Sequence, residues 1–102
     1  MKRYNKLVRD KIPEIIRAEG KECEVKIAED KEKYELLEKK LMEEVNEFLE
    51  DKNIDELADI MEVLFELANE LGYSEEDLIR NREEKKGERG GFKEGIVLKG
   101  VK

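Results

Sequence analysis

Four acidic side chains occur in this chain as two pairs, each with a three-residue spacing. The first pair is Glu44 and Glu47, and the second is Glu56 and Asp59. Residues three positions apart share one face of an α-helix, so each pair would direct two carboxylates the same way. Four converging carboxylates repel one another unless a positive group lies among them, and a divalent cation is the most compact such group. We therefore predict that these four acids bind a metal ion.

The position of Glu56 in its helix favours this prediction. At about 100° per residue, Glu56 lies angularly between Val63 and Leu67. The same helix carries an apolar stripe formed by Leu57, Ile60, Leu64, Leu67 and Leu71. Because an uncompensated carboxylate rarely faces a core, the alternative of an ordinary solvated glutamate fits Glu56 poorly.

The available ligand types select the metal. The chain has no histidine and its only cysteine is Cys23, so every ligand would be an oxygen. Oxygen ligands favour Mg²⁺, for which Mn²⁺ can substitute, over Zn²⁺. Such a site leaves positions for water and for substrate phosphates, which predicts hydrolysis of a phosphoanhydride. We assign Glu44 and Glu47 as the catalytic acids, with Glu44 the first choice for the general base or for bridging two cations, although the sequence leaves the division of roles open.

Other polar residues could contribute around these acids. Glu43 lies about 100° from Glu44 on the helix, so we expect it beside the cluster and outside the ligand set. Asn46 and Asn69 could donate hydrogen bonds to a substrate, or could simply be solvated helix residues.

Basic side chains form one group near each end of the chain, and both groups could serve only to balance surface charge. The groups are Lys6, Arg9 and Lys11, and Lys85, Lys86, Arg89 and Lys93. Arg89 precedes Gly90 and Gly91, where backbone amides can approach a phosphate that the guanidinium binds with two hydrogen bonds. The predicted phosphate-binding residues are Arg9, Lys11, Lys86 and Arg89.

The two acidic segments, E-V-N-E and E-L-A-D, resemble the E-x-x-E and E-x-x-D signature of the MazG-like and phosphoribosyl-ATP pyrophosphohydrolase superfamily of all-α nucleotide pyrophosphatases. Residues 5–14, N-K-L-V-R-D-K-I-P-E, and residues 89–92, R-G-G-F, look like a small-protein branch of that group. The resemblance implies a MazG-like antiparallel helix bundle. Only eight residues separate Glu47 from Glu56, fewer than in the usual signature, so we expect a tight turn between the two helices.

The same resemblance implies an activity. The enzymes of this group cut nucleoside triphosphates between the α- and β-phosphates with Mg²⁺, releasing a monophosphate and pyrophosphate, and the implied role is removal of non-standard or surplus nucleotides. One alternative is phosphoribosyl-ATP hydrolysis, which shares the fold and the metal site. Another is a non-catalytic helical interaction protein that retains a vestigial metal site.

Composition limits the class of protein and of partner. At 102 residues we expect a single domain over 1–102. Although 48% of the residues are charged, the charges alternate with periodic apolar residues, which indicates a helical protein rather than disorder. The net charge of −7 argues against a nucleic-acid polymer as partner. No segment is apolar enough to enter a membrane, so a cytoplasmic location is expected. The absence of Gln, Thr, His and Trp is typical of a hyperthermophile.

Periodicity and capping residues predict where the elements lie. We expect a short helix around Pro13, which ends at Gly20, and long helices over 31–51, 55–71 and 75–86, with Asp30, Asn53 or Asp55, and Ser74 as N-caps. Alternating patterns predict a pair of short strands near 22–28 and 95–99. The 55–71 helix is apolar over more than half its circumference, so we expect a second subunit to cover one side, in a homodimer or higher homo-oligomer.

Overall fold

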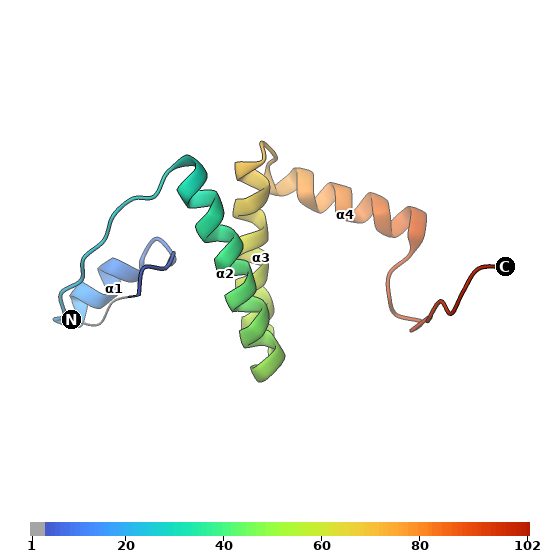
Figure 1. Ribbon diagram of the computed structural model, residues 1–102, viewed down its shortest axis with the longest axis horizontal. Helices are drawn as coiled ribbons and strands as arrows, with labels where there is room; N and C mark the ends of the chain where they lie inside the picture. Colours follow the sequence, from blue (N-terminus) through green and yellow to red (C-terminus); the bar gives the residue numbers. More distant parts are fainter. Residues whose placement is uncertain (1–3) are drawn as a thin grey trace.

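The computed structural model describes residues 4–102, and within that range it contains four α-helices and no β-strand (Figure 1). The helices are α1 (Ile12–Ala18), α2 (Asp30–Asp51), α3 (Ile54–Glu70) and α4 (Glu75–Arg89). The predicted all-α fold is confirmed. In the part of the chain that the structure describes, no helix is both long enough and apolar enough to cross a lipid bilayer.

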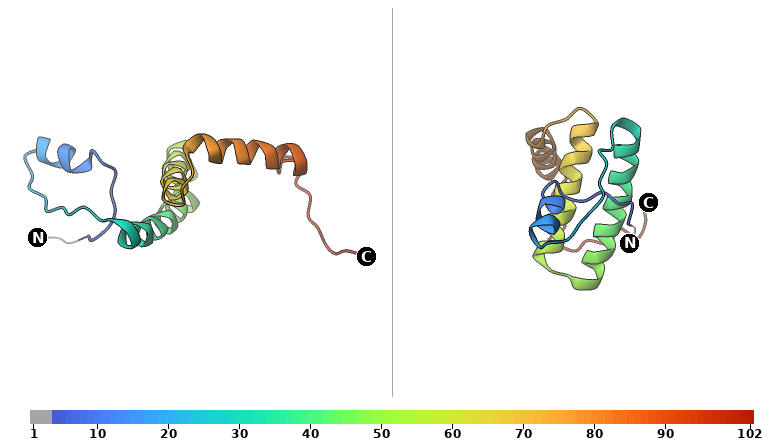
Figure 2. Two further views of the ribbon diagram at one scale, coloured as in Figure 1. Left: turned by 90° about the horizontal axis from the view of Figure 1, so that it is seen from above. Right: turned by 90° about the vertical axis from the view of Figure 1, so that its left-hand side faces the viewer.

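An antiparallel hairpin of α2 and α3 forms the centre of the molecule. Helix α4 packs against α3, whereas α1 packs against none of the other three described helices. Figure 2 shows α1 and α4 extending to opposite sides of the hairpin. The hairpin is therefore the element that holds the two acidic segments side by side.

The turn between α2 and α3 is as tight as the short spacing of the acids requires. Helix α2 ends with Lys52 in the left-handed conformation, at a φ of 50°, and its backbone N–H donates to the carbonyl of Phe48. Asn53 caps α3, because its side-chain oxygen accepts a hydrogen bond of 3.0 Å from the backbone N–H of Glu56. The cap thus fixes the first turn of α3, where Glu56 lies.

The hairpin has a thin core. Only Leu37 of α2 and Val63 and Ala68 of α3 are buried apolar residues among residues 4–102. At the end of the hairpin remote from its turn, Lys33 of α2 pairs with Glu66 of α3 at 2.8 Å. The Cα radius of gyration is 17.8 Å, compared with about 13 Å for a compact domain of this length. A single chain therefore leaves much of its apolar surface open.

Three of the four predicted helix starts are confirmed, that of α3 by the Asn53 cap described above, and one is wrong. Ser74 and Asp77 form a complete capping box at the start of α4, and Pro13 lies in the first turn of α1. Asp30, expected as a cap, is instead the first residue of α2, and the side chain of Glu29 at the cap position makes no capping hydrogen bond. Asp30 has a φ of 50°, a left-handed conformation that a cap residue does not normally adopt.

The predicted strands near 22–28 and 95–99 are wrong for the described chain. Their large aliphatic residues are exposed, with Ile27 and Ile96 each 82% accessible. The two segments lie on opposite sides of the molecule (Figure 1), so neither can provide the ladder of hydrogen bonds that the other needs. An alternating pattern alone does not form a strand without such a partner.

Candidate metal centre

The hairpin places the acidic pairs at its turn end, on facing helices. Glu44 and Glu47 lie in the last two turns of α2, and Glu56 and Asp59 lie in the first two turns of α3. Because the helices are antiparallel and joined by a short turn, the end of one helix lies beside the start of the other. The local fold therefore brings two segments with three-residue spacing to one place.

The carboxylates form two overlapping groups that share Glu44. In the first group, oxygens of Glu43, Glu44 and Glu47 all lie within 4.8 Å of one another, and in the second the same holds for Glu44, Glu56 and Asp59. The structure thus brings together all four acids that the sequence singled out. It also brings Glu43 closer to Glu44 than the angular estimate suggested, because long side chains can reach across the helix surface.

Glu44 is the most unusual residue of the cluster because it is buried. Its accessibility is 6%, and Lys40 approaches its Oε1 at 3.1 Å. Its Oε2 is buried and has no hydrogen-bond partner, and the same is true of Oε2 of Glu56. Every other buried side-chain oxygen or nitrogen of residues 4–102 has a partner. Buried polar atoms are nearly always satisfied, so these two oxygens are available to a bound group such as a cation.

The acids also shift one another's proton affinity. A side-chain hydrogen bond with Glu44, together with desolvation and the charges of Glu44 and Glu56, raises the pKa of Glu47 to about 7. Desolvation and the charges of Asp51, Asp59 and Glu44 raise the pKa of Glu56, against an opposing hydrogen bond with Glu47. Two carboxyls in contact are stabilised by a shared proton or by a cation, so Glu47 keeps its proton to a higher pH than an isolated glutamate does.

Three cations border the cluster. In the segment before α1, Arg9 donates to Asp59 at 2.6 Å and Lys6 donates to Glu43 at 3.2 Å. Lys40 of α2 lies 3.5 Å from Glu43 in addition to its contact with Glu44. Five carboxylates and three cations leave a formal charge of −2, which one divalent cation would neutralise and two would reverse. The donor set and charge therefore suit a divalent cation with oxygen ligands.

The other predicted phosphate-binding residues lie apart from this cluster within one chain. Lys11 is exposed at the start of α1 and forms no ion pair with any residue of 4–102. Lys86 and Arg89 are in the last turn of α4, which points away from the hairpin in Figures 1 and 2. Of the predicted set, only Arg9 contacts an acid of the cluster.

Sequence reasoning missed the role of Lys40, although a signal for it was present. A lysine four residues before a glutamate lies on the same helix face, and Lys40 precedes Glu44 by four residues and Glu43 by three. Such pairs are common on exposed helices, so spacing alone gave no reason to single this one out. What distinguishes it is the low accessibility of both partners, 17% for the Lys40 side chain and 7% for that of Glu44.

Comparison of this chain with models of protein families, with curated proteins and with solved structures found no match. The class of protein therefore follows from the fold and from the geometry of the site alone. The chain is an all-α protein whose central hairpin carries an acidic cluster that could hold a divalent cation.

Proposed function

We propose that this chain is a Mg²⁺-dependent nucleoside triphosphate pyrophosphohydrolase of the MazG-like type, which cleaves between the α- and β-phosphates. The observation that carries the proposal is the buried Glu44, whose Oε2 has no partner although four other carboxylates surround it. The resemblance of the E-V-N-E and E-L-A-D segments to that superfamily supports the same interpretation.

The proposed roles follow from where each side chain lies. Glu44, Glu47, Glu56 and Asp59 would hold the cation, which when bound withdraws charge from phosphate oxygens and lowers the pKa of water. Glu47 is more exposed than Glu44, so it can accept a proton from an attacking water. Arg9, the cation nearest Asp59, would bind a phosphate through its planar guanidinium.

We further propose that the working form is a homodimer or a higher homo-oligomer. Helix α3 exposes Leu57, Met61 and Leu64, at 45%, 52% and 39%, on the side that α2 leaves uncovered. The radius of gyration exceeds that of a compact domain, so one chain does not bury enough apolar surface for a stable fold of its own. A second copy presents a matching apolar face, and closed homo-oligomers are the common solution.

A screen of nucleoside triphosphates with Mg²⁺ or Mn²⁺ tests the proposal. Phosphate should be released from at least one nucleotide only when a coupling pyrophosphatase is present, and Glu44→Gln should abolish the release. Glu50→Gln is a matched control, because Glu50 is an exposed acid of the same helix outside the cluster. Turnover of phosphoribosyl-ATP and of no nucleoside triphosphate would show that the chain is a phosphoribosyl-ATP pyrophosphohydrolase. Metal binding without turnover of any of these substrates would favour an interaction protein.

A further inference from the structure

Lys40 is the least exposed of the three cations at the cluster. Its side chain is 17% accessible, compared with 44% for Lys6 and 54% for Arg9. Its ammonium lies 3.1 Å from Oε1 of Glu44 and 3.5 Å from Oε2 of Glu43, so it forms ion pairs with two neighbouring acids of α2. A partly buried ammonium in this place stabilises the acids in the same way that a metal ion would.

Lys40 and a metal ion therefore compete for Glu44. Glu44 belongs to both carboxylate groups. A cation held by either group would therefore pair with the same carboxylate that Lys40 contacts in this structure. Binding of the cation weakens the attraction between Lys40 and Glu44, and a partly buried ammonium that loses its partner needs another anion. A lysine suits such an exchange because its ammonium is a compact charge on a flexible stem with three donors.

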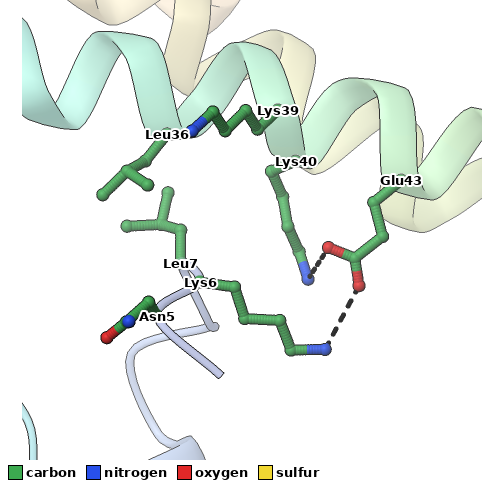
Figure 3. Close-up of a pocket in the computed structure, with 7 residues that line it drawn as sticks. All are labelled: Asn5, Lys6, Leu7, Leu36, Lys39, Lys40 and Glu43. Carbon is green, nitrogen blue, oxygen red and sulfur yellow. Dashed lines mark hydrogen bonds and ion pairs between the residues drawn. The ribbon is translucent and has the colours of Figure 1, made fainter. Parts of the chain in front are cut away.

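A second ammonium, that of Lys6, lies at the other oxygen of Glu43. Figure 3 shows that Lys40 and Lys6 each approach a different oxygen of Glu43, whereas Lys39 points away from Glu43. These residues line a small pocket between α2 and the segment before α1, together with Asn5, Leu7 and Leu36. Lys6 also lies 5.5 Å from the centre of the Tyr4 ring, a cation–π contact that helps to hold it there.

We propose that Lys40 is an exchangeable counter-ion that neutralises Glu44 in the metal-free protein, releases it to a divalent cation, and then binds a phosphate group of the substrate together with Lys6. This inference rests on the proposed function. In this exchange the metal and the phosphate favour each other's binding. The metal frees Lys40 for the phosphate, and the phosphate holds Lys40 away from Glu44, which the metal needs. Each ligand alone then binds more weakly than it does in the presence of the other.

Calorimetric titration with Mn²⁺, with and without inorganic phosphate, measures this coupling. In the wild-type protein phosphate should tighten Mn²⁺ binding by about fivefold or more, the usual size of a coupling between sites. Lys40→Met should bind Mn²⁺ more tightly than wild type when phosphate is absent, because the competing charge has gone, and phosphate should then change the affinity by less than about twofold. Lys39→Met is the matched control and should behave as wild type.

The outcomes separate the inference from the function on which it rests. Wild-type protein that binds no Mn²⁺ overturns both. Wild-type protein that binds Mn²⁺, with Lys40→Met binding it equally or more weakly and keeping the phosphate effect, overturns the role of Lys40 and leaves the metal site standing. Circular dichroism shows whether Lys40→Met folds. If it does not, Lys40→Arg, which retains the charge, provides the comparison and should keep the effect of phosphate on Mn²⁺ affinity. Loss of that effect in folded Lys40→Arg would contradict the exchange.

Discussion

Replacing Glu47 with glutamine should raise the stability of the metal-free protein and reduce the stability that the protein gains from bound metal. At pH 8, above the pKa of about 7, Glu47 is ionised and lies close to Glu44. Two like charges about 4 Å apart repel by about 1 kcal/mol in water and about 4 kcal/mol at the dielectric of a protein surface. Because Glu47 is open to solvent, the lower value applies. The glutamine amide can in addition donate to the unpartnered Oε2 of Glu44.

Metal-free Glu47→Gln should therefore be more stable than wild type by about 1 kcal/mol, which raises the Tm by about 4–8 °C for a domain of this size. With Mn²⁺ at about 100 times its Kd, wild type should gain about 2.7 kcal/mol, or roughly 10–20 °C, and Glu47→Gln should gain only a small fraction of that. Differential scanning calorimetry in EDTA and in Mn²⁺, at one protein concentration, provides both values. Glu50→Gln should match wild type in both buffers. A variant that melts lower than wild type in EDTA and keeps the full Mn²⁺ shift would refute the reasoning.

Three further predictions concern the metal site, the assembly and the pH dependence of the hairpin. Glu56→Gln should remove Mn²⁺ binding and turnover while the helical content stays unchanged, and unchanged Mn²⁺ affinity in calorimetry would exclude Glu56 from the site. Leu64→Glu should give monomers or unfolded chains in sedimentation, and wild-type protein that sediments as a stable monomer at micromolar concentration would contradict the proposed assembly. A hydrogen bond from Lys33, partly opposed by desolvation, lowers the pKa of Glu66 below its ordinary value of 4.5, so this pair stabilises the protein above that pH and its contribution is lost as the pH falls through the lowered pKa. Lowering the pH from 6 to 3 should therefore reduce the Tm of Lys33→Met by less than it reduces the Tm of wild type. An equal reduction in both would show that the Lys33–Glu66 pair does not contribute to stability.

The fold class and the acid cluster could be predicted because both depend on local rules. Three-residue spacing sets the face of a helix, and Asn53 and Ser74 start helices through hydrogen bonds to residues three positions away. Once the turn between α2 and α3 is known to be short, the antiparallel arrangement follows. The convergence of Glu44 with Glu56 is therefore a consequence of helix periodicity and of a two-residue connection.

Features that depend on distant or absent partners could not be predicted in the same way. The segments near 22–28 and 95–99 have strand-like patterns, but pairing requires proximity that only the tertiary arrangement decides. The contact of Arg9 with Asp59 spans 50 positions of the chain. Lys40 differs from the other lysines through burial, and burial depends on how α2 packs. The distance of Lys86 and Arg89 from the cluster depends likewise on the direction in which α4 leaves the hairpin.

Hydrolysis in ¹⁸O-labelled water, with mass spectrometry of the products, tests the proposed reaction most directly. The nucleotide identified in the screen is incubated with the protein and Mg²⁺, and the inorganic product is separated from the nucleotide. The account predicts pyrophosphate and a nucleoside monophosphate, with one ¹⁸O atom in one of the two and no product from Glu44→Gln. Orthophosphate together with a nucleoside diphosphate, or no product from protein that demonstrably binds the metal, would contradict it.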